Sequence, residues 1–391
     1  RLKWNPISNS VVGDSNIVNL ITTGYDHLGG RLLAAKQNGI PYLFLAVVDH
    51  GISEQNAPTC YVPQSTNPNN FTQDVTTQNG KIHRFAMDGS VPPDNPIPGN
   101  SYYTRGHRNP QGLMFNPNLD LIYDIEHGDR TDDEINVLQK GMNYGWKDVR
   151  GFHGDSSFSG EAAYVANYLP NPLIANDALI EPLFAWCTSP STSSNWTDWC
   201  TVAPSGGEYY NSNAIAQWQN SLLVVTLKDG LSTNMELYQF KLQANGDLET
   251  STPQNPNPKK FFGSEQTLNG RLRDIAVSND GQTIYLVNNG GGGGDKITVY
   301  QYDNTTTIQD YSGQLLNIEI FPNPTNGLLT LKGIKDLSAI EDIHISSLLG
   351  KNIEVQLNSN FQVDVSGFVN GIHFIHFRLD SYVYTLKFVK F

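Results

Sequence analysis

Asn-Gly and Asp-Gly dipeptides between short apolar runs place the strongest constraint on how this 391-residue chain can fold. A two-residue turn of type I′ requires positive φ at both central residues, so these dipeptides predict tight β-hairpins. Helical periodicity is confined to residues 133–140 and 160–168. The sequence therefore predicts an all-β chain. Examples of the dipeptides are Asn38-Gly39, Asp88-Gly89, Asn245-Gly246, Asp280-Gly281 and Asn326-Gly327.

The strand–turn unit recurs loosely, as at residues 81–89, 237–246 and 272–286. Irregular repetition over about 300 residues favours a β-propeller, because a single β-sandwich rarely extends that far. The pattern stops at residues 305–313, which are rich in Thr, Ser and Gly. We therefore predict a propeller over residues 1–308, a linker over 309–314 and a small β-sandwich over 315–391. The strands of the sandwich are expected at residues 318–321, 328–331, 343–346, 372–378 and 382–387.

Charge and hydropathy exclude two classes of partner. The chain has 25 Lys and Arg against 38 Asp and Glu, a formal charge of −13. Proteins that bind nucleic acid in general need a basic surface that displaces counterions from phosphate, so we expect no nucleic-acid partner. No segment approaches the roughly 20 apolar residues of a membrane span. The sequence begins at Arg1 rather than at Met, so we expect a mature form or a fragment.

The chain has three cysteines, and two of them flank a short loop rich in Ser, Thr and Trp. A disulfide between Cys187 and Cys200 would stabilise the fold by about 3 kcal/mol in the chain-entropy model. Two reduced thiols are the alternative interpretation. Cys60 is expected to remain without a disulfide partner.

Three segments combine histidine with glycine or charge, as expected of loops that build a site on a rigid β scaffold. The first, DHLGGR at residues 26–31, joins a carboxylate to an imidazole, as a general base needs, although many such pairs lie in surface turns. The second is GHRNPQGL at residues 106–113. The third, at residues 126–134, is rich in oxygen ligands and suits calcium, but Thr131 and Glu134 equally fit the capping box of a helix.

Together with four later motifs, these segments resemble the soluble PQQ-dependent glucose and aldose dehydrogenases, which are six-bladed propellers of the glucose/sorbosone dehydrogenase family. The resemblance covers roughly residues 20–303. Because few residues precede His27, it also implies that an N-terminal blade is missing or incomplete. The later motifs, in the family's order, are DDEIN followed by NYGW (132–136 and 143–146), CTVAPS (200–205), LKDG (227–230) and RLRD (271–274).

The resemblance implies oxidation of an aldose at its anomeric carbon to the lactone, by hydride transfer to PQQ. His27, held by Asp26, would be the general base. Arg108 and Asn109 would donate to the quinone oxygen, where negative charge develops. The remaining assignments are Lys228, Arg271 and Arg273 for the cofactor carboxylates, Thr201 with Trp196 or Trp199 for the cofactor wall, and Asp26, Gln55 and Gln111 for the substrate side. The family's substrate-side glutamine falls at Glu54 or Gln55, and both positions stay open.

The family also uses calcium. The resemblance implies one ion bound by backbone oxygens of Gly128 and Asp129, where it would polarise the quinone. Glucose-oxidising relatives carry proline at the position of Asp129, so this residue either strengthens calcium binding or reshapes the pocket. A second, structural calcium would use Glu134, Tyr144 and carbonyls near Arg150 and Phe152.

Residues 315–391 resemble the type IX secretion sorting domain of Bacteroidota. The resemblance rests on FPNPTNG (321–327), SLLGK (347–351), VSGFVNGI (365–372) and the closing KFVK (387–390). It implies export through the periplasm and outer membrane to the cell surface or the medium, with the type IX machinery and an external electron acceptor as partners. A small sugar-binding sandwich is the alternative for this module. For the whole chain, the alternative is an inactive secreted propeller that binds glycans or a protein.

Overall fold

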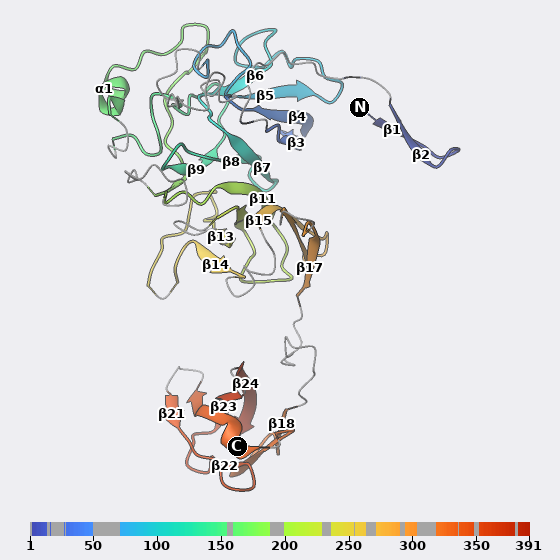
Figure 1. The fold of residues 1–391 in the computed structure, drawn as a ribbon, viewed down its shortest axis with the longest axis vertical. Helices are drawn as coiled ribbons and strands as arrows, with labels where there is room; N and C mark the ends of the chain where they lie inside the picture. The colour runs from blue at the N-terminus through green and yellow to red at the C-terminus, as the bar shows by residue number, and fades with distance from the viewer. Residues whose placement is uncertain are drawn as a thin grey trace. The chain divides into compact units, whose positions relative to one another are not determined.

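The chain folds into two compact units, Arg1–Tyr302 and Asp303–Phe391, in the computed structural model (Figure 1). Nearly all of its regular structure is antiparallel β-sheet, which confirms the predicted all-β class. Among the described residues, no helix is both long and apolar enough to cross a membrane. The structure describes residues 2–13, 16, 27, 29–49, 71–154, 159–187, 199–228, 236–253, 255–262, 271–289, 294–302, 318–334, 336–347, 352–379 and 382–391.

The N-terminal unit contains a hairpin and four sheets whose strands follow one another along the chain. The hairpin is β1 (Leu2–Asn5) with β2 (Ser10–Gly13). The first sheet is β3 (Leu32–Gln37), β4 (Ile40–Val47), β5 (Lys81–Ala86) and β6 (Tyr102–Arg105). The second is β7 (Pro110–Asn116), β8 (Leu121–Glu126), β9 (Asp133–Val137) and β10 (Phe184–Trp186). The third is β11 (Pro204–Tyr210), β12 (Ser221–Thr226), β13 (Leu237–Lys241) and β14 (Lys259–Phe261), and the fourth is β15 (Arg271–Val277), β16 (Thr283–Asn289) and β17 (Ile297–Gln301).

The first strands of the four sheets lie side by side, with β7 against β3, β11 against β7, and β15 against β11. Three apolar clusters fill the spaces between successive sheets. Strand β12 shows why: Leu222 and Val224 belong to the cluster shared with the second sheet, and Leu223 and Val225 to the cluster shared with the fourth. Alternate side chains of a strand point to opposite faces, so a strand buried on both faces is apolar throughout. Sheets stacked face to face around their first strands are arranged as propeller blades.

The tight turns differ from the prediction in their type. At Asn38-Gly39, φ is 50° and 78°, as a type I′ hairpin between β3 and β4 requires. At Asp88-Gly89, Asn245-Gly246 and Asp280-Gly281, only the glycine has positive φ. There the glycine closes a longer turn, as Gly281 does by donating its N–H to the carbonyl of Ser278 at 2.8 Å. The dipeptides mark turns correctly, but the type I′ geometry is wrong at these three sites and at Asn326-Gly327, where neither residue has positive φ.

One of the two helical segments is wrong. Residues 133–140 form no helix, because Asp133–Val137 is strand β9, paired with β8 and β10. The Thr131–Glu134 capping box is therefore also wrong. The burial of this segment between two strands, which its acidic composition conceals, explains the error. The other segment is confirmed, since α1 spans Glu161–Ala166.

The disulfide interpretation of the cysteine pair is confirmed. Cys187, directly after β10, is bonded to Cys200, shortly before β11, with the two Cα atoms 5.7 Å apart. The bridge joins the end of the second sheet to the start of the third, next to Thr201. Cys60 lies outside the described residues.

The C-terminal unit contains two antiparallel sheets that bury one apolar cluster, including Leu329, Val363, Ile375 and Phe388. All five strands expected here are present, and β21 and β22 were missed. One sheet is β18 (Glu319–Phe321), β19 (Leu328–Lys332) and β22 (Gln362–Asp364). The other is β21 (Asn352–Glu354), β20 (Ile340–Ser347), β23 (Gly371–Leu379) and β24 (Tyr382–Lys390), and a 3₁₀ turn (η5) spans Leu337–Ala339.

Acid is expected to destabilise the N-terminal unit through His83. This side chain is 1% exposed, and burial lowers its pKa from 6.5 to about 4. Between these two values the unfolded chain binds a proton that the folded chain does not, so the contribution to stability is complete above pH 6.5 and is lost as pH falls towards 4. A shift of this size corresponds to a contribution on the order of 3 kcal/mol.

Urea unfolding followed by tryptophan fluorescence at pH 7 and pH 4.5 tests this expectation, because all six tryptophans lie in the N-terminal unit. A His83→Asn variant should lose less stability between the two pH values than the unmodified protein. Parallel losses in both proteins would show that His83 does not contribute to the acid sensitivity.

Candidate functional site

One end of the four sheets carries the motif residues. Arg108 and Asn109 directly precede β7, Thr201 precedes β11, and Arg271 begins β15. Lys228 follows β12, the antiparallel partner of β11, so it lies at the same end. In each sheet the first two strands are antiparallel, so the start of the first strand lies beside the end of the second. Because the first strands of successive sheets are neighbours, the segments at these strand ends come together although they are far apart in sequence.

These segments enclose a pocket of about 350 Å³. Eight residues expected from the sequence to hold cofactor, metal or proton line it: His27, Arg108, Asn109, Gly128, Asp129, Thr201, Lys228 and Arg271. Trp199, one of the two tryptophans expected at the cofactor wall, also lines it. The other lining residues are His127, Asp133, Ala203 and Leu227.

His27 is oriented by a buried carboxylate that the sequence did not reveal. Its Nδ1 lies 2.7 Å from Oδ1 of Asp49, which is 2% exposed and follows the end of β4. The other oxygen, Oδ2, accepts from Nε1 of Trp146 at 2.9 Å. A carboxylate next to Nδ1 favours the tautomer with the proton on Nδ1, which leaves Nε2 as a proton acceptor. Asp26, the expected partner of His27, lies outside the described residues.

Arg108 is held from several sides. Its backbone N–H donates to Oε2 of Glu126 at 3.0 Å, and its carbonyl accepts from the N–H of Asp49 at 2.8 Å. The guanidinium carbon lies 5.4 Å from the ring centre of Trp146, and Nη2 lies 3.8 Å from Oδ1 of Asp129. The Nε atom is buried and has no hydrogen-bond partner among the described residues. The chain therefore fixes the backbone N–H and carbonyl of this residue and leaves the buried Nε of its side chain available to a ligand.

Cationic groups dominate the pocket. Burial lowers the pKa of Lys228, and burial followed by the charge of Arg273 lowers that of Arg271. The pKa of His127 falls to about 3 because of burial and then the charges of Arg108 and His27, so this imidazole is neutral. The lowered pKa values of Lys228, Arg271 and His127 indicate that the pocket without a bound anion disfavours positive charge on these side chains. An anion bound in the pocket would relieve that cost.

The loop from Gly128 to Asp133 closes against the pocket. A Cβ atom on Gly128 would lie 1.8 Å from the carbonyl oxygen of Thr131, so only glycine fits. Asp133 accepts from the N–H groups of Gly128, Val202 and Ala203 at 2.9, 2.6 and 2.8 Å. This carboxylate ties the loop after β8 to the segment before β11, although burial raises its pKa to about 6.

The other expected site residues lie around the pocket or beyond it. Gln111 donates from Nε2 to Oδ1 of Asn109 at 2.7 Å, and Arg273 is half-buried on β15. Arg150 places its Nη2 3.3 Å from Oδ2 of Asp129. The hydroxyl of Tyr144 donates to the carbonyl of Val137 and accepts from the N–H of Gln139. The side chain of Phe152 is exposed. Glu54, Gln55 and Trp196 lie outside the described residues.

Glu134 is the one member of the expected structural calcium set that contacts the segment around Arg150. Its Oε1 accepts from the N–H of Gly151 at 2.7 Å. Burial and the neighbouring charge of Glu126 raise the pKa of Glu134 well above its usual range. The chain thus brings a buried carboxylate to the segment that the resemblance assigns to calcium.

Comparison with known proteins gives two family matches. The glucose/sorbosone dehydrogenase family matches residues 16–298, and the secretion system C-terminal sorting domain matches residues 319–390. Quinoprotein glucose dehydrogenase B of Acinetobacter calcoaceticus is 30% identical over 336 residues, which cover 75% of this chain and 65% of that protein. An aldose sugar dehydrogenase of Escherichia coli K12 is 29% identical over 277 residues, which cover 70% of this chain and 60% of that protein.

The chain therefore spans less than two thirds of the length of these two relatives. A solved glucose dehydrogenase structure aligns with a TM-score of 0.53 at 22% identity, over 78% of this chain and 72% of the other, which supports the fold. The family match covers most of the chain and includes all the motifs that meet at the pocket. This protein thus belongs to the glucose/sorbosone dehydrogenase family and carries a C-terminal secretion sorting domain.

Proposed function

We propose that the N-terminal unit is a PQQ- and calcium-dependent dehydrogenase that oxidises an aldose at its anomeric carbon to the lactone. The observation that carries this proposal is the pocket itself, which joins an imidazole oriented by a carboxylate to three cationic side chains. The Acinetobacter relative is a quinoprotein glucose dehydrogenase, which supports the assignment of a quinone cofactor.

The residues of the pocket fit PQQ. The cofactor carries three carboxylates, and Arg108, Lys228 and Arg271 all line the cavity. The buried Nε of Arg108 supplies a donor that no described residue uses. Asn109 and Thr201 add polar groups beside the cations. Arg273 is close enough to Arg271 to lower its pKa, so it adds to the positive potential at this wall.

When bound, PQQ would supply the quinone that accepts the hydride, and calcium would polarise it. The chain's own residues would handle the proton. Nε2 of His27 would take it from the anomeric hydroxyl, while Asp49 stabilises the imidazolium that forms. Arg108, fixed by Glu126 and Asp129, would place positive charge where negative charge develops.

Calcium ligands are proposed at the backbone of Gly128 and Asp129. The carboxylate of Asp129 lies between the guanidiniums of Arg108 and Arg150, at 3.8 and 3.3 Å. It therefore acts first as the counter-charge of two arginines, which favours the interpretation that aspartate at this position reshapes the pocket. The second calcium is proposed at Glu134, with Tyr144 and carbonyls near Arg150 and Phe152.

We further propose that the four sheets belong to a six-bladed propeller, that the C-terminal sheets form a β-sandwich, and that this domain directs export by the type IX system to the cell surface or the medium. An external acceptor would reoxidise the cofactor. An exported propeller that binds glycans without turnover is the alternative function.

Reconstitution tests the proposed activity. The purified full chain is mixed with PQQ and calcium, and reduction of an artificial electron acceptor is followed with a broad panel of aldoses. Turnover that requires PQQ, calcium and sugar together, with lactone as the product, is the expected result. PQQ binding without turnover of any sugar would contradict the enzyme and support the binding protein, and absence of PQQ binding would contradict the cofactor assignment.

A further inference from the structure

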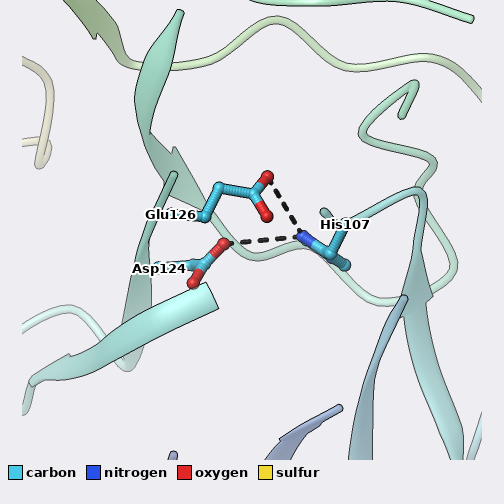
Figure 2. Close-up of side chains that lie close together, drawn as sticks. All are labelled: His107, Asp124 and Glu126. Carbon is cyan, nitrogen blue, oxygen red and sulfur yellow. Dashed lines mark ion pairs between the residues drawn. The ribbon is translucent and has the colours of Figure 1, made fainter. Parts of the chain in front are cut away.

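A second group of polar side chains lies between strand β8 of the second sheet and the segment that joins β6 to β7, apart from the residues that line the pocket. His107, Asp124 and Glu126 come together there (Figure 2), with exposed fractions of 0%, 0% and 3%. Nδ1 of His107 lies 3.5 Å from Oδ2 of Asp124 and 3.6 Å from Oε1 of Glu126. Asp124 and Glu126 are two residues apart on β8, so they point to the same face.

These separations are longer than those of hydrogen bonds, which join nitrogen and oxygen at about 2.7–3.2 Å. They match the distance between two ligands of one metal ion, because bonds of about 2.0–2.1 Å at tetrahedral angles place the ligand atoms about 3.4 Å apart. One ligand atom from each of the three residues lies within 4.8 Å of the others.

Several atoms of the group lack the hydrogen bonds that burial normally requires. Nδ1 of His107 and both carboxylate oxygens of Asp124 have no hydrogen-bond partner among the described residues. The same holds for Oδ1 of Asn136, the residue opposite Asp124 on β9. Leaving a buried polar group unsatisfied costs about 1–3 kcal/mol, and more when it is charged. A cation at the centre of the group would satisfy these atoms.

The local charge points the same way. Glu134 lies opposite Glu126 in the β8–β9 ladder and shares the amide of Asn136 with it, at 3.1 and 3.4 Å. Three buried carboxylates, those of Asp124, Glu126 and Glu134, therefore lie close together on β8 and β9, and the first two have only the imidazole of His107 within ion-pair distance among the described residues. A divalent ion would offset the negative charge that a single imidazolium cannot.

The imidazole is already oriented for such a role. Its Nε2 lies 2.9 Å from Oγ1 of Thr104, and the ring stacks on Tyr144 with centres 4.6 Å apart. A hydrogen bond at the second nitrogen fixes the ring and the tautomer of metal-binding histidines.

We propose that His107, Asp124 and Glu126 bind a divalent first-row transition metal, such as zinc, in a structural site between β8 and the segment that joins β6 to β7. Imidazole nitrogen suits zinc or its neighbours, whereas calcium takes oxygen ligands only. Asn136 offers a fourth ligand through Oδ1. Because Oε2 of Glu126 accepts from the N–H of Arg108, the metal would also stiffen the wall of the pocket. This inference does not depend on the proposed dehydrogenase activity.

The rival is an imidazolium held by the two carboxylates. Burial opposes it, but Glu126 and Asp124 more than offset this and raise the pKa of His107 to about 9. Metal analysis separates the two. The full chain is unfolded with chelator, refolded with and without Zn²⁺ and dialysed. The zinc retained per chain is then measured by elemental mass spectrometry.

We expect about one tightly held zinc per chain, lost in His107→Gln and in Asp124→Asn but kept in His83→Gln. His83 is a matched control, because it is equally buried and its two ring nitrogens already have Ser101 and Gln78 as partners. No retained zinc in the unmodified chain, or equal zinc in all four proteins, would overturn the site.

X-ray absorption of the unmodified, zinc-loaded chain tests the proposal even if the variants fail to fold. The expected spectrum shows one imidazole and oxygen ligands at about 2.0–2.1 Å. A first shell without imidazole would overturn the assignment.

Discussion

A His27→Asn variant is expected to lose about 10²- to 10⁴-fold in kcat, the range that a positioned general base supplies, while it keeps its affinity for PQQ. The loss follows from the geometry at the pocket: Nδ1 of His27 is bonded to Asp49 at 2.7 Å, which leaves Nε2 as the proton acceptor. Asparagine keeps a polar side chain of similar reach but cannot accept the proton. The measurements are steady-state turnover with aldose and an absorbance titration with PQQ.

Asp49→Asn is the companion variant. Because Nε1 of Trp146 can only donate, the amide oxygen would accept from it and the amide NH2 would face Nδ1 of His27, which moves the imidazole proton to Nε2 as well as removing the charge that stabilises the imidazolium. We expect a loss of about 10²- to 10⁴-fold in kcat, comparable to that of His27→Asn, with KM less affected, because Nε2 is then no longer a proton acceptor. His83→Asn serves as the control, since His83 lies away from the pocket. Full turnover in His27→Asn would refute the base assignment.

The sequence located much of the pocket but not the partner of its base. Arg108, Gly128 and Arg271 belong to dense local motifs, and such motifs are visible without a structure. Asp49 lies 22 residues after His27, just beyond the end of the apolar strand β4, and no local sequence pattern distinguishes it. Only the pairing of β3 with β4 brings the two residues to the same end of the first sheet. A register of that kind is not encoded in either segment alone.

The polar face of the second sheet shows a different limit. From the sequence alone, residues 126–134 suit either calcium or the cap of a helix, and residues 133–140 are expected to be helical. In the structure, Asp124, Glu126 and Asn136 are buried on the same pair of strands. Alternation normally places polar side chains towards solvent, so burial of this polar face contradicts the usual interpretation. The propeller supplies the reason, because the second sheet is covered by its neighbours on both sides.

Removing the pocket's cations is expected to weaken PQQ binding strongly. Lys228→Met and Arg271→Met should each raise the Kd for PQQ by roughly 10- to 150-fold, since a charged hydrogen bond contributes about 1.5–3 kcal/mol. Both residues line the cavity, and the pKa of each is lowered, by burial at Lys228 and by burial followed by the charge of Arg273 at Arg271. An anion bound in the cavity would favour the charged form of both side chains.

Lys36→Met is the matched control, because Lys36 is exposed on β3 and does not line the pocket. Titration of each variant with PQQ, at low and at high salt, gives the test. In the unmodified protein the Kd should rise with salt, and this dependence should be weaker in Lys228→Met and Arg271→Met, since part of the long-range attraction has been removed. Unchanged affinity in both variants would mean that the cofactor's carboxylates are held elsewhere. In that case the convergence of cations at the ends of β12 and β15 would have another anion as its reason.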